Sequence, residues 1–151
     1  MTSAEDVLAT ARTVLVVDWP SKDVPETLAR GGFEVVVHGG PAPEDYTAYE
    51  LRDDRVVTRR VGRPPDHADV VYSYRPLDEL AGIVDLARAV GARTVWVQSG
   101  LVAEGEKDPT GCWLPEGAAS EPRAVVEAAG LAYLDQPYIA DAVRALPTSQ
   151  P

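Results

Sequence analysis

Cysteine and histidine are scarce in this chain of 151 residues. Cys112 is the only cysteine, and His38 and His67 are the only histidines. A single cysteine excludes an intramolecular disulfide and a cysteine-based zinc site. Because the chain has so few of the nitrogen and sulfur ligands that transition metals prefer, we expect no metal site.

Basic residues and long apolar runs are also in short supply. Lys and Arg number 14 against 24 Asp and Glu, so the net charge is −10. This charge argues against non-specific nucleic-acid binding, which depends on neutralising phosphates. No stretch approaches the roughly 18 apolar residues of a membrane span, and the acidic start MTSAEDVLATARTV lacks the apolar core of a signal peptide. We therefore expect a cytoplasmic protein without a membrane or nucleic-acid partner, in which residues 1–151 form one domain.

The stretch from Ala68 to Leu101 has the clearest pattern. An apolar run at 70–72 precedes apolar residues at helical spacing over 80–90, and Gly91 ends that helix. A second apolar run follows at 94–97. Such a strand–helix–strand crossover is right-handed in nearly all proteins, so the two strands should be parallel neighbours in a sheet covered by helices.

Comparable patterns predict the remaining elements. We expect helices over 2–12, 23–30, 120–129 and 138–146, strands over 13–17, 33–37 and 131–134, and a hairpin over 46–62. The predicted fold is α/β: a Rossmann-like open parallel sheet of about five strands, with helices on both faces and a small edge hairpin.

Polar loops follow the predicted parallel strands. In open α/β sheets, ligands bind outside the carboxyl ends of the strands, where these loops meet. We therefore expect a ligand site at this edge. Its candidate residues are Asp18, Trp19, Ser21, Lys22, His38, Gly39, Tyr74, Arg75, Pro76, Gln98, Ser99 and Gly100.

The polar candidates also have structural explanations. Asp18 could cap the following helix, which needs no ligand. Arg75 could bind a phosphate or carboxylate through two hydrogen bonds, or pair with Asp78 or Glu79 in the next helix. His38 could contact a ribose or adenine, although a surface or packed histidine is the favoured interpretation.

Four segments of the chain resemble those of a known family. They are Ala68-Asp69-Val70-Val71, Tyr74-Arg75-Pro76, Gly91-Ala92-Arg93-Thr94-Val95-Trp96-Val97-Gln98 and Ser99-Gly100-Leu101-Val102. Their order and spacing are similar to those of the small stand-alone CoA-binding-domain proteins, which are Rossmann-like and related to the nucleotide-binding domain of succinyl-CoA synthetase. The resemblance covers most of the chain. It implies a pocket for coenzyme A, acyl-CoA or a related adenine nucleotide, and no particular reaction.

The chain departs from that family in the first strand–helix turn. Family members have Gly-Ala-Ser there, whereas this chain has Asp18-Trp19-Pro20-Ser21. Glycine lets the backbone approach a pyrophosphate at the helix N-terminus, and a carboxylate ~4 Å from a phosphate charge costs about 1 kcal/mol in bulk water. Near the C-terminus, Asp135-Gln136-Pro137 replaces Asp-Arg-Cys. The first departure weakens the usual pyrophosphate mode, and the second leaves no cysteine to act there.

Five arginines form the one basic concentration; four fall in the predicted hairpin and the fifth directly follows it. They are Arg52, Arg55, Arg59, Arg60 and Arg63. These residues could attract the 3′-phosphate of coenzyme A or an acidic partner. Alternation along a strand places Arg59 and Arg60 on opposite faces, however, which favours a solvated hairpin.

Two further residues, Cys112 and Trp113, lie in a long loop over 104–117. The sequence supplies no cation or helix start that would activate the thiol, whereas Trp113 and Trp19 could line a pocket or a dimer contact.

No nucleophile elbow, P-loop or histidine pair is present. Our first hypothesis is a non-catalytic CoA-binding module. The alternative is a degenerate member that has lost CoA binding and acts through protein contacts as a homodimer; an enzyme using a carboxylate such as Asp18 is a weaker third.

Overall fold

The computed structural model of the chain describes residues 3–18, 23–39, 42, 44–74, 79–97, 120–135 and 138–146. The strands are β1 (Thr13–Val17), β2 (Glu34–His38), β3 (Tyr46–Arg52), β4 (Arg55–Arg60), β5 (Val70–Ser73), β6 (Thr94–Val97) and β7 (Ala132–Leu134). The helices are α1 (Ala4–Thr10), α2 (Asp23–Arg30), α3 (Leu80–Ala89), α4 (Ser120–Ala128) and α5 (Ile139–Arg144). None of these helices has the length and apolar composition of a membrane span.

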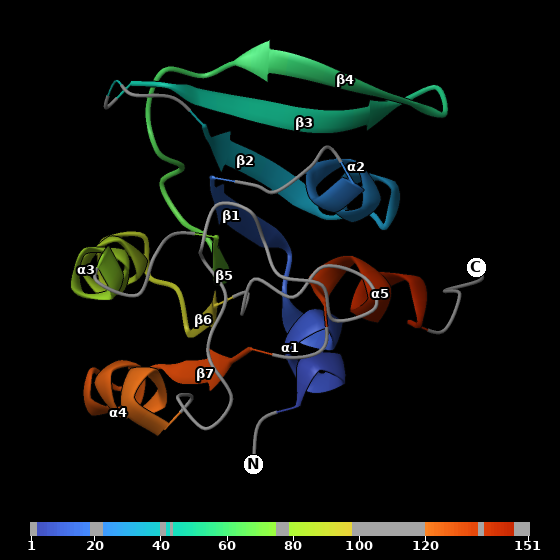
Figure 1. Cartoon of the computed structure of the whole chain (residues 1–151). Helices are drawn as coiled ribbons and strands as arrows, with labels where there is room; N and C mark the ends of the chain where they lie inside the picture. Colours follow the sequence, from blue (N-terminus) through green and yellow to red (C-terminus); the bar gives the residue numbers. More distant parts are fainter. Residues whose placement is uncertain are drawn as a thin grey trace.

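The strands form one seven-stranded sheet in the order β4-β3-β2-β1-β5-β6-β7 (Figure 1). β2, β1, β5, β6 and β7 are parallel to one another. β3 and β4 are an antiparallel hairpin at one edge. The predicted Rossmann-like α/β fold is confirmed, and the two hairpin strands account for the larger number of strands.

Helices cover both faces of this sheet. Because side chains alternate between faces along a strand, Val14 and Val16 pack in one core with residues of α1, α2 and α5. Leu15 and Val17 pack in a second core with residues of α3 and α4. Figure 1 shows these two sets of helices on opposite sides of the sheet. Burial on both faces explains why β1 is a continuous apolar run.

The predicted bounds of β1, α2 and β6 are confirmed, and other element ends differ by one or two residues. At the start of α1, the Oγ of Ser3 accepts the backbone N–H of Asp6 at 3.1 Å, as a cap should. That helix ends earlier than predicted because Ala11 is already extended, with ψ of 147°. β2 runs one residue further than predicted, since His38 still pairs with Val17 of β1.

The edge hairpin turns on two residues. Arg52 and Arg55 are the last cross-strand pair, and Asp53 and Asp54 between them have φ of 51° and 64°. Positive φ at both positions defines a type I′ turn, whose twist matches that of the strands and which favours Asn and Gly. Two aspartates therefore hold a backbone conformation that glycine adopts with less strain.

Candidate functional site

The loops after β1, β2 and β5 meet at the carboxyl edge of the sheet. The backbone N–H of Asp18 donates to the carbonyl of His38 at 2.8 Å, and the N–H of Tyr74 donates to the carbonyl of Val17 at 3.1 Å. Gly39 directly follows His38. The structure thus brings Asp18, His38, Gly39 and Tyr74 to one edge, and these are the predicted site residues that it describes.

Asp18 has a left-handed backbone conformation, with φ of 55°. Such a φ is uncommon for residues with a side chain, although aspartate is among those that tolerate it. At Asp18 the chain therefore makes the kind of backbone turn that glycine favours, with a carboxylate added. Its N–H is bound to the carbonyl of His38 and so is not free to meet a phosphate.

His38 is held by the loop that follows β2. Its ring centroid lies 4.7 Å from that of Tyr46, and its Nε2 lies 3.2 Å from the carbonyl oxygen of Ala42. The N–H of Gly39 donates to the carbonyl of Asp45 at 3.2 Å. Burial raises the pKa of the Tyr46 phenol. These contacts support the packing explanation of His38, and its contact with a ligand stays a prediction.

The first residue of α2 is tied to α5 next to the predicted site. The carboxylate of Asp23 forms an ion pair with Arg144 and accepts the hydroxyl of Tyr138 at 3.3 Å. Arg144 also donates to the Oγ1 of Thr27 at 3.1 Å. Sequence reasoning missed Arg144 and Tyr138, because they lie 121 and 115 residues from Asp23 and belong to no motif.

The end of β7 adds a phenol and a carboxylate to the same edge. The hydroxyl of Tyr133 donates to Oδ2 of Asp135 at 3.0 Å, and the guanidinium of Arg123 lies 4.9 Å from the Tyr133 ring centroid. Burial raises the pKa of Tyr133 well above its ordinary value, and Asp135 raises it further. Tyr133 therefore remains a neutral donor at this edge.

The other predicted site residues lie outside the described part of the chain. They are Trp19, Ser21, Lys22, Arg75, Pro76, Gln98, Ser99 and Gly100. The same holds for Asp78, Cys112 and Trp113. Their proposed contacts stay predictions from the sequence.

The charges of the described edge bear on whether coenzyme A fits. This cofactor carries a pyrophosphate and a 3′-phosphate, so its site must supply positive charge or free N–H donors. Asp18, Asp23 and Asp135 are acidic, and Arg144 is paired with Asp23. The described residues of this edge therefore do not supply the positive charge that a pyrophosphate on α2 needs.

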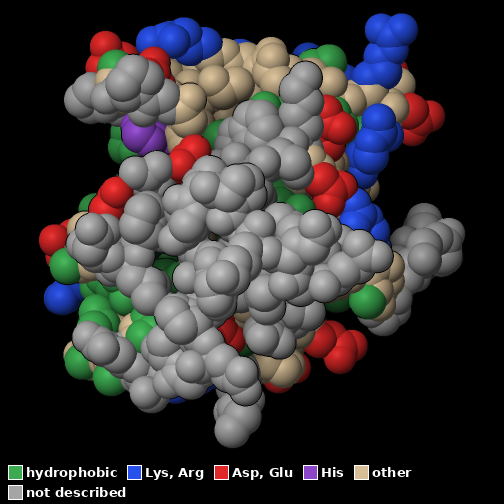
Figure 2. Space-filling model, viewed as in Figure 1, with side chains coloured by type: hydrophobic (Ala, Val, Ile, Leu, Met, Phe, Trp, Pro, Cys, Tyr) green, Lys and Arg blue, Asp and Glu red, His purple; other side chains and the backbone are tan. Residues whose placement is uncertain are grey.

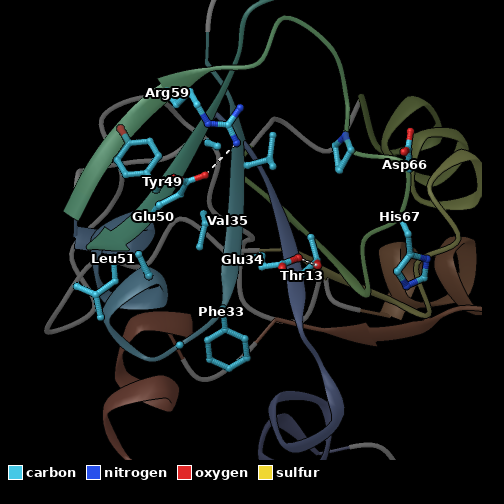
Figure 3. Close-up of a pocket in the computed structure, with 15 residues that line it drawn as sticks. Thr13, Phe33, Glu34, Val35, Tyr49, Glu50, Leu51, Arg59, Asp66 and His67 are labelled. Atoms are coloured by element: carbon cyan, nitrogen blue, oxygen red, sulfur yellow. Dashed lines mark hydrogen bonds and ion pairs between the residues drawn. The ribbon is translucent and has the colours of Figure 1, made fainter. Parts of the chain in front are cut away.

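A hollow of about 700 Å³ lies elsewhere, near the amino ends of β1 and β2. Figure 3 shows Arg59 and Glu50 on one side of it and His67 on the other. The Thr13 hydroxyl donates to Glu34 at 2.8 Å. A hydrogen bond from Arg59 at 2.9 Å holds the pKa of Glu50 below its ordinary value, and Arg52 acts in the same direction. Glu34 and Glu50 are thus engaged by neighbours, and this hollow contains none of the predicted site residues.

Asp69, which belongs to the family-like segment Ala68-Asp69-Val70-Val71, has a structural role. Its Oδ2 accepts the backbone N–H groups of Arg12 at 2.8 Å and Thr13 at 3.0 Å, and its Oδ1 lies 3.0 Å from Nε2 of His67. Partial burial alone would raise the pKa of Asp69, but the two N–H donors and His67 outweigh it, so the pKa lies below its ordinary value. Asp69 thereby ties the start of β1 to the segment entering β5, at the edge opposite the predicted site.

An open, mostly parallel sheet with helices on both faces and loops gathered at its carboxyl edge defines the Rossmann-like class of α/β fold. The family profile of the CoA binding domain matches residues 16–139, which is most of the chain. The chain therefore belongs to the CoA binding domain family, as the four sequence segments predicted. A search of curated proteins found no match to it.

Proposed function

We propose that this chain is a non-catalytic binding module for coenzyme A or acyl-CoA, or for a related adenine nucleotide. The observation that carries the proposal is the family match over residues 16–139, which includes every loop at the carboxyl edge of the parallel strands. The meeting of Asp18, His38, Gly39 and Tyr74 at that edge supports it. We further propose that residues 1–151 act as one domain in the cytoplasm.

The proposal assigns a separate role in ligand binding to each of several predicted site residues outside the described part of the chain. Lys22 and Arg75 supply the positive charge for the phosphates, because the described edge is acidic. Gly100 permits close approach of the backbone to the ligand, with Gln98 and Ser99 as hydrogen-bonding neighbours. Trp19, within the altered first turn, is the proposed aromatic residue of the pocket.

Titration calorimetry against coenzyme A tests the proposal, with acetyl-CoA, ATP and NAD as comparators. We expect micromolar binding of coenzyme A to the unmodified protein. Arg75→Ala should weaken it by about tenfold or more, because a hydrogen bond to a charged group contributes ~1.5–3 kcal/mol. Arg93→Ala is the matched control, since exposed Arg93 precedes β6 at the opposite edge of the sheet. A folded protein that gives no heat with any of the four ligands would refute the proposal.

One observation favours the alternative, a member that has lost CoA binding and acts as a homodimer through protein contacts. The turn that should receive a pyrophosphate carries Asp18, and the first turn of α2 adds Asp23 and Glu26. Under this alternative all four ligands fail, and light scattering gives the mass of a dimer. A monomer that binds coenzyme A contradicts it.

A further inference from the structure

The outer edge of β4 is open within the described part of the chain. β4 is the last strand of the sheet, and its residues pair only with β3 (Figure 1). Five of its six residues are exposed, and Val56 is half-buried. An edge strand of this kind presents unpaired N–H and C=O groups to which another strand can bind.

The two-residue turn determines which backbone groups of β4 point outward. Arg52 and Arg55 close the turn and so exchange hydrogen bonds with each other, and such pairs then recur at every second residue. Arg55, Val57 and Arg59 therefore bond to β3. The N–H and C=O groups of Val56, Thr58 and Arg60 point away from the sheet.

The side chains of this edge are arginine and apolar. Figure 2 shows basic side chains along the top of the molecule, where Figure 1 places the hairpin. Arg59 and Arg60 are ion-paired to Glu50 and Asp45 yet keep 61% and 66% of their side-chain surface exposed. Val57 is 36% exposed, which is high for a large apolar side chain. Arginine beside exposed apolar surface is typical of protein interfaces.

The same arginines disfavour pairing of β4 with a second copy of itself. Residues directly opposite each other in an antiparallel pair have the same hydrogen-bonding type, so the register that places Val57 opposite Val57 of the other copy also places Arg55 opposite Arg59. Like charges directly opposite each other are destabilising. A strand with acidic residues opposite Arg55, Arg59 and Arg60, and an apolar residue opposite Val57, has none of this repulsion. Charge complementarity at Arg55, Arg59 and Arg60 therefore favours an acidic strand over another β4.

We propose that the outer edge of β4 binds an extended acidic segment of another protein as an added antiparallel strand. Main-chain hydrogen bonds to Val56, Thr58 and Arg60 supply the affinity, and the arginine side chains supply the selectivity, as in other cases of strand addition. This surface goes beyond ligand binding at the carboxyl edge and does not depend on it.

A labelled peptide with the sequence Glu-Glu-Thr-Val-Thr-Glu is the probe, because it places glutamate opposite each arginine and valine opposite Val57. Fluorescence anisotropy against the full chain should show saturable binding that weakens as salt is raised. The matched peptide with lysine in place of every glutamate should bind at least about tenfold more weakly. Absence of binding by the acidic peptide, or equal binding of the two, would overturn the proposal.

A backbone variant separates strand addition from simple charge attraction. Thr58→Pro removes an outward N–H without removing a bond to β3, and proline is tolerated on this side of an edge strand. It should abolish peptide binding, whereas Thr58→Ala should retain it, with circular dichroism showing that both fold. Retained binding in a folded Thr58→Pro variant would refute strand addition. A dimer that Thr58→Pro converts to a monomer would show that a second copy occupies the edge instead.

Discussion

The carboxylate of Asp69 links the start of β1 to the segment entering β5, and replacing it tests how much this link stabilises the fold. In the Asp69→Ala variant, the N–H of Thr13 loses its acceptor, and Thr13 is only 8% exposed. A buried donor without a partner costs about 1–3 kcal/mol. The N–H of exposed Arg12 can turn to water at little cost. We therefore expect Asp69→Ala to lower the free energy of unfolding by about 2–3 kcal/mol, which is a fall in Tm of about 5–10 °C for a chain of this size.

The assay is denaturant and thermal unfolding of this variant beside two others. Asp69→Asn keeps an oxygen acceptor but loses the charge, so its cost should be about 1 kcal/mol. Asp66→Ala is the matched control, because Asp66 is an exposed carboxylate three residues earlier, and its effect should stay within about 0.5 kcal/mol. Equal stability of Asp69→Ala and Asp66→Ala would refute the reasoning.

The pKa of Asp69 adds a pH signature to this prediction. Because the folded-state pKa is lowered, the stability that the carboxylate contributes is present above its unfolded pKa of about 3.9 and is lost as pH falls through the lower folded value. The difference in stability between the unmodified protein and Asp69→Asn should therefore shrink below about pH 4. A difference that stays constant down to pH 2 would contradict the assigned cause.

Three further substitutions test local features. Asp54→Gly should raise Tm by about 1–4 °C in thermal unfolding, because glycine adopts the φ of 64° without strain; a lower Tm would contradict the turn assignment. Gly31→Ala should cost about 1–2 kcal/mol, because its Cβ would lie 2.8 Å from Cγ1 of Val143, and Val143→Ala in the same chain should recover part of that loss. Asp18→Gly should raise the affinity for coenzyme A in calorimetry about fivefold, because one carboxylate leaves the first turn. Unchanged affinity would place the phosphates away from Asp18.

The sequence predicted those parts of the fold whose cause is local. β1 and β6 are buried on both faces and so are plain apolar runs, and α2 has a regular amphipathic pattern bounded by a polar loop and by Gly31. The carboxyl edge followed from the parallel order of the strands, because the loops after parallel strands emerge on the same side. The sequence could therefore assign Asp18, His38, Gly39 and Tyr74 to this edge, and their contact with a ligand stays a prediction.

The contacts that the sequence did not reveal are long-range or conformational. The pairing of Asp23 with Arg144 joins two helices that are adjacent only in the folded chain. Asp69 was identified through its family-like segment, but its backbone acceptor role appears only when β1 and β5 lie side by side. The positive φ of Asp18 has no signature in a single sequence, because most aspartates adopt ordinary conformations.

The ligand edge and the β4 edge are separate enough to be tested independently. β4 lies three strands from β1, about 14 Å at the usual ~4.8 Å strand spacing, and its outward groups point away from the parallel sheet. Thr58→Pro should therefore leave the affinity for coenzyme A unchanged, and Arg75→Ala should leave peptide binding unchanged. If either substitution impairs both activities in a folded protein, one surface serves both, and the hairpin arginines would then be expected to contact the phosphates of the cofactor.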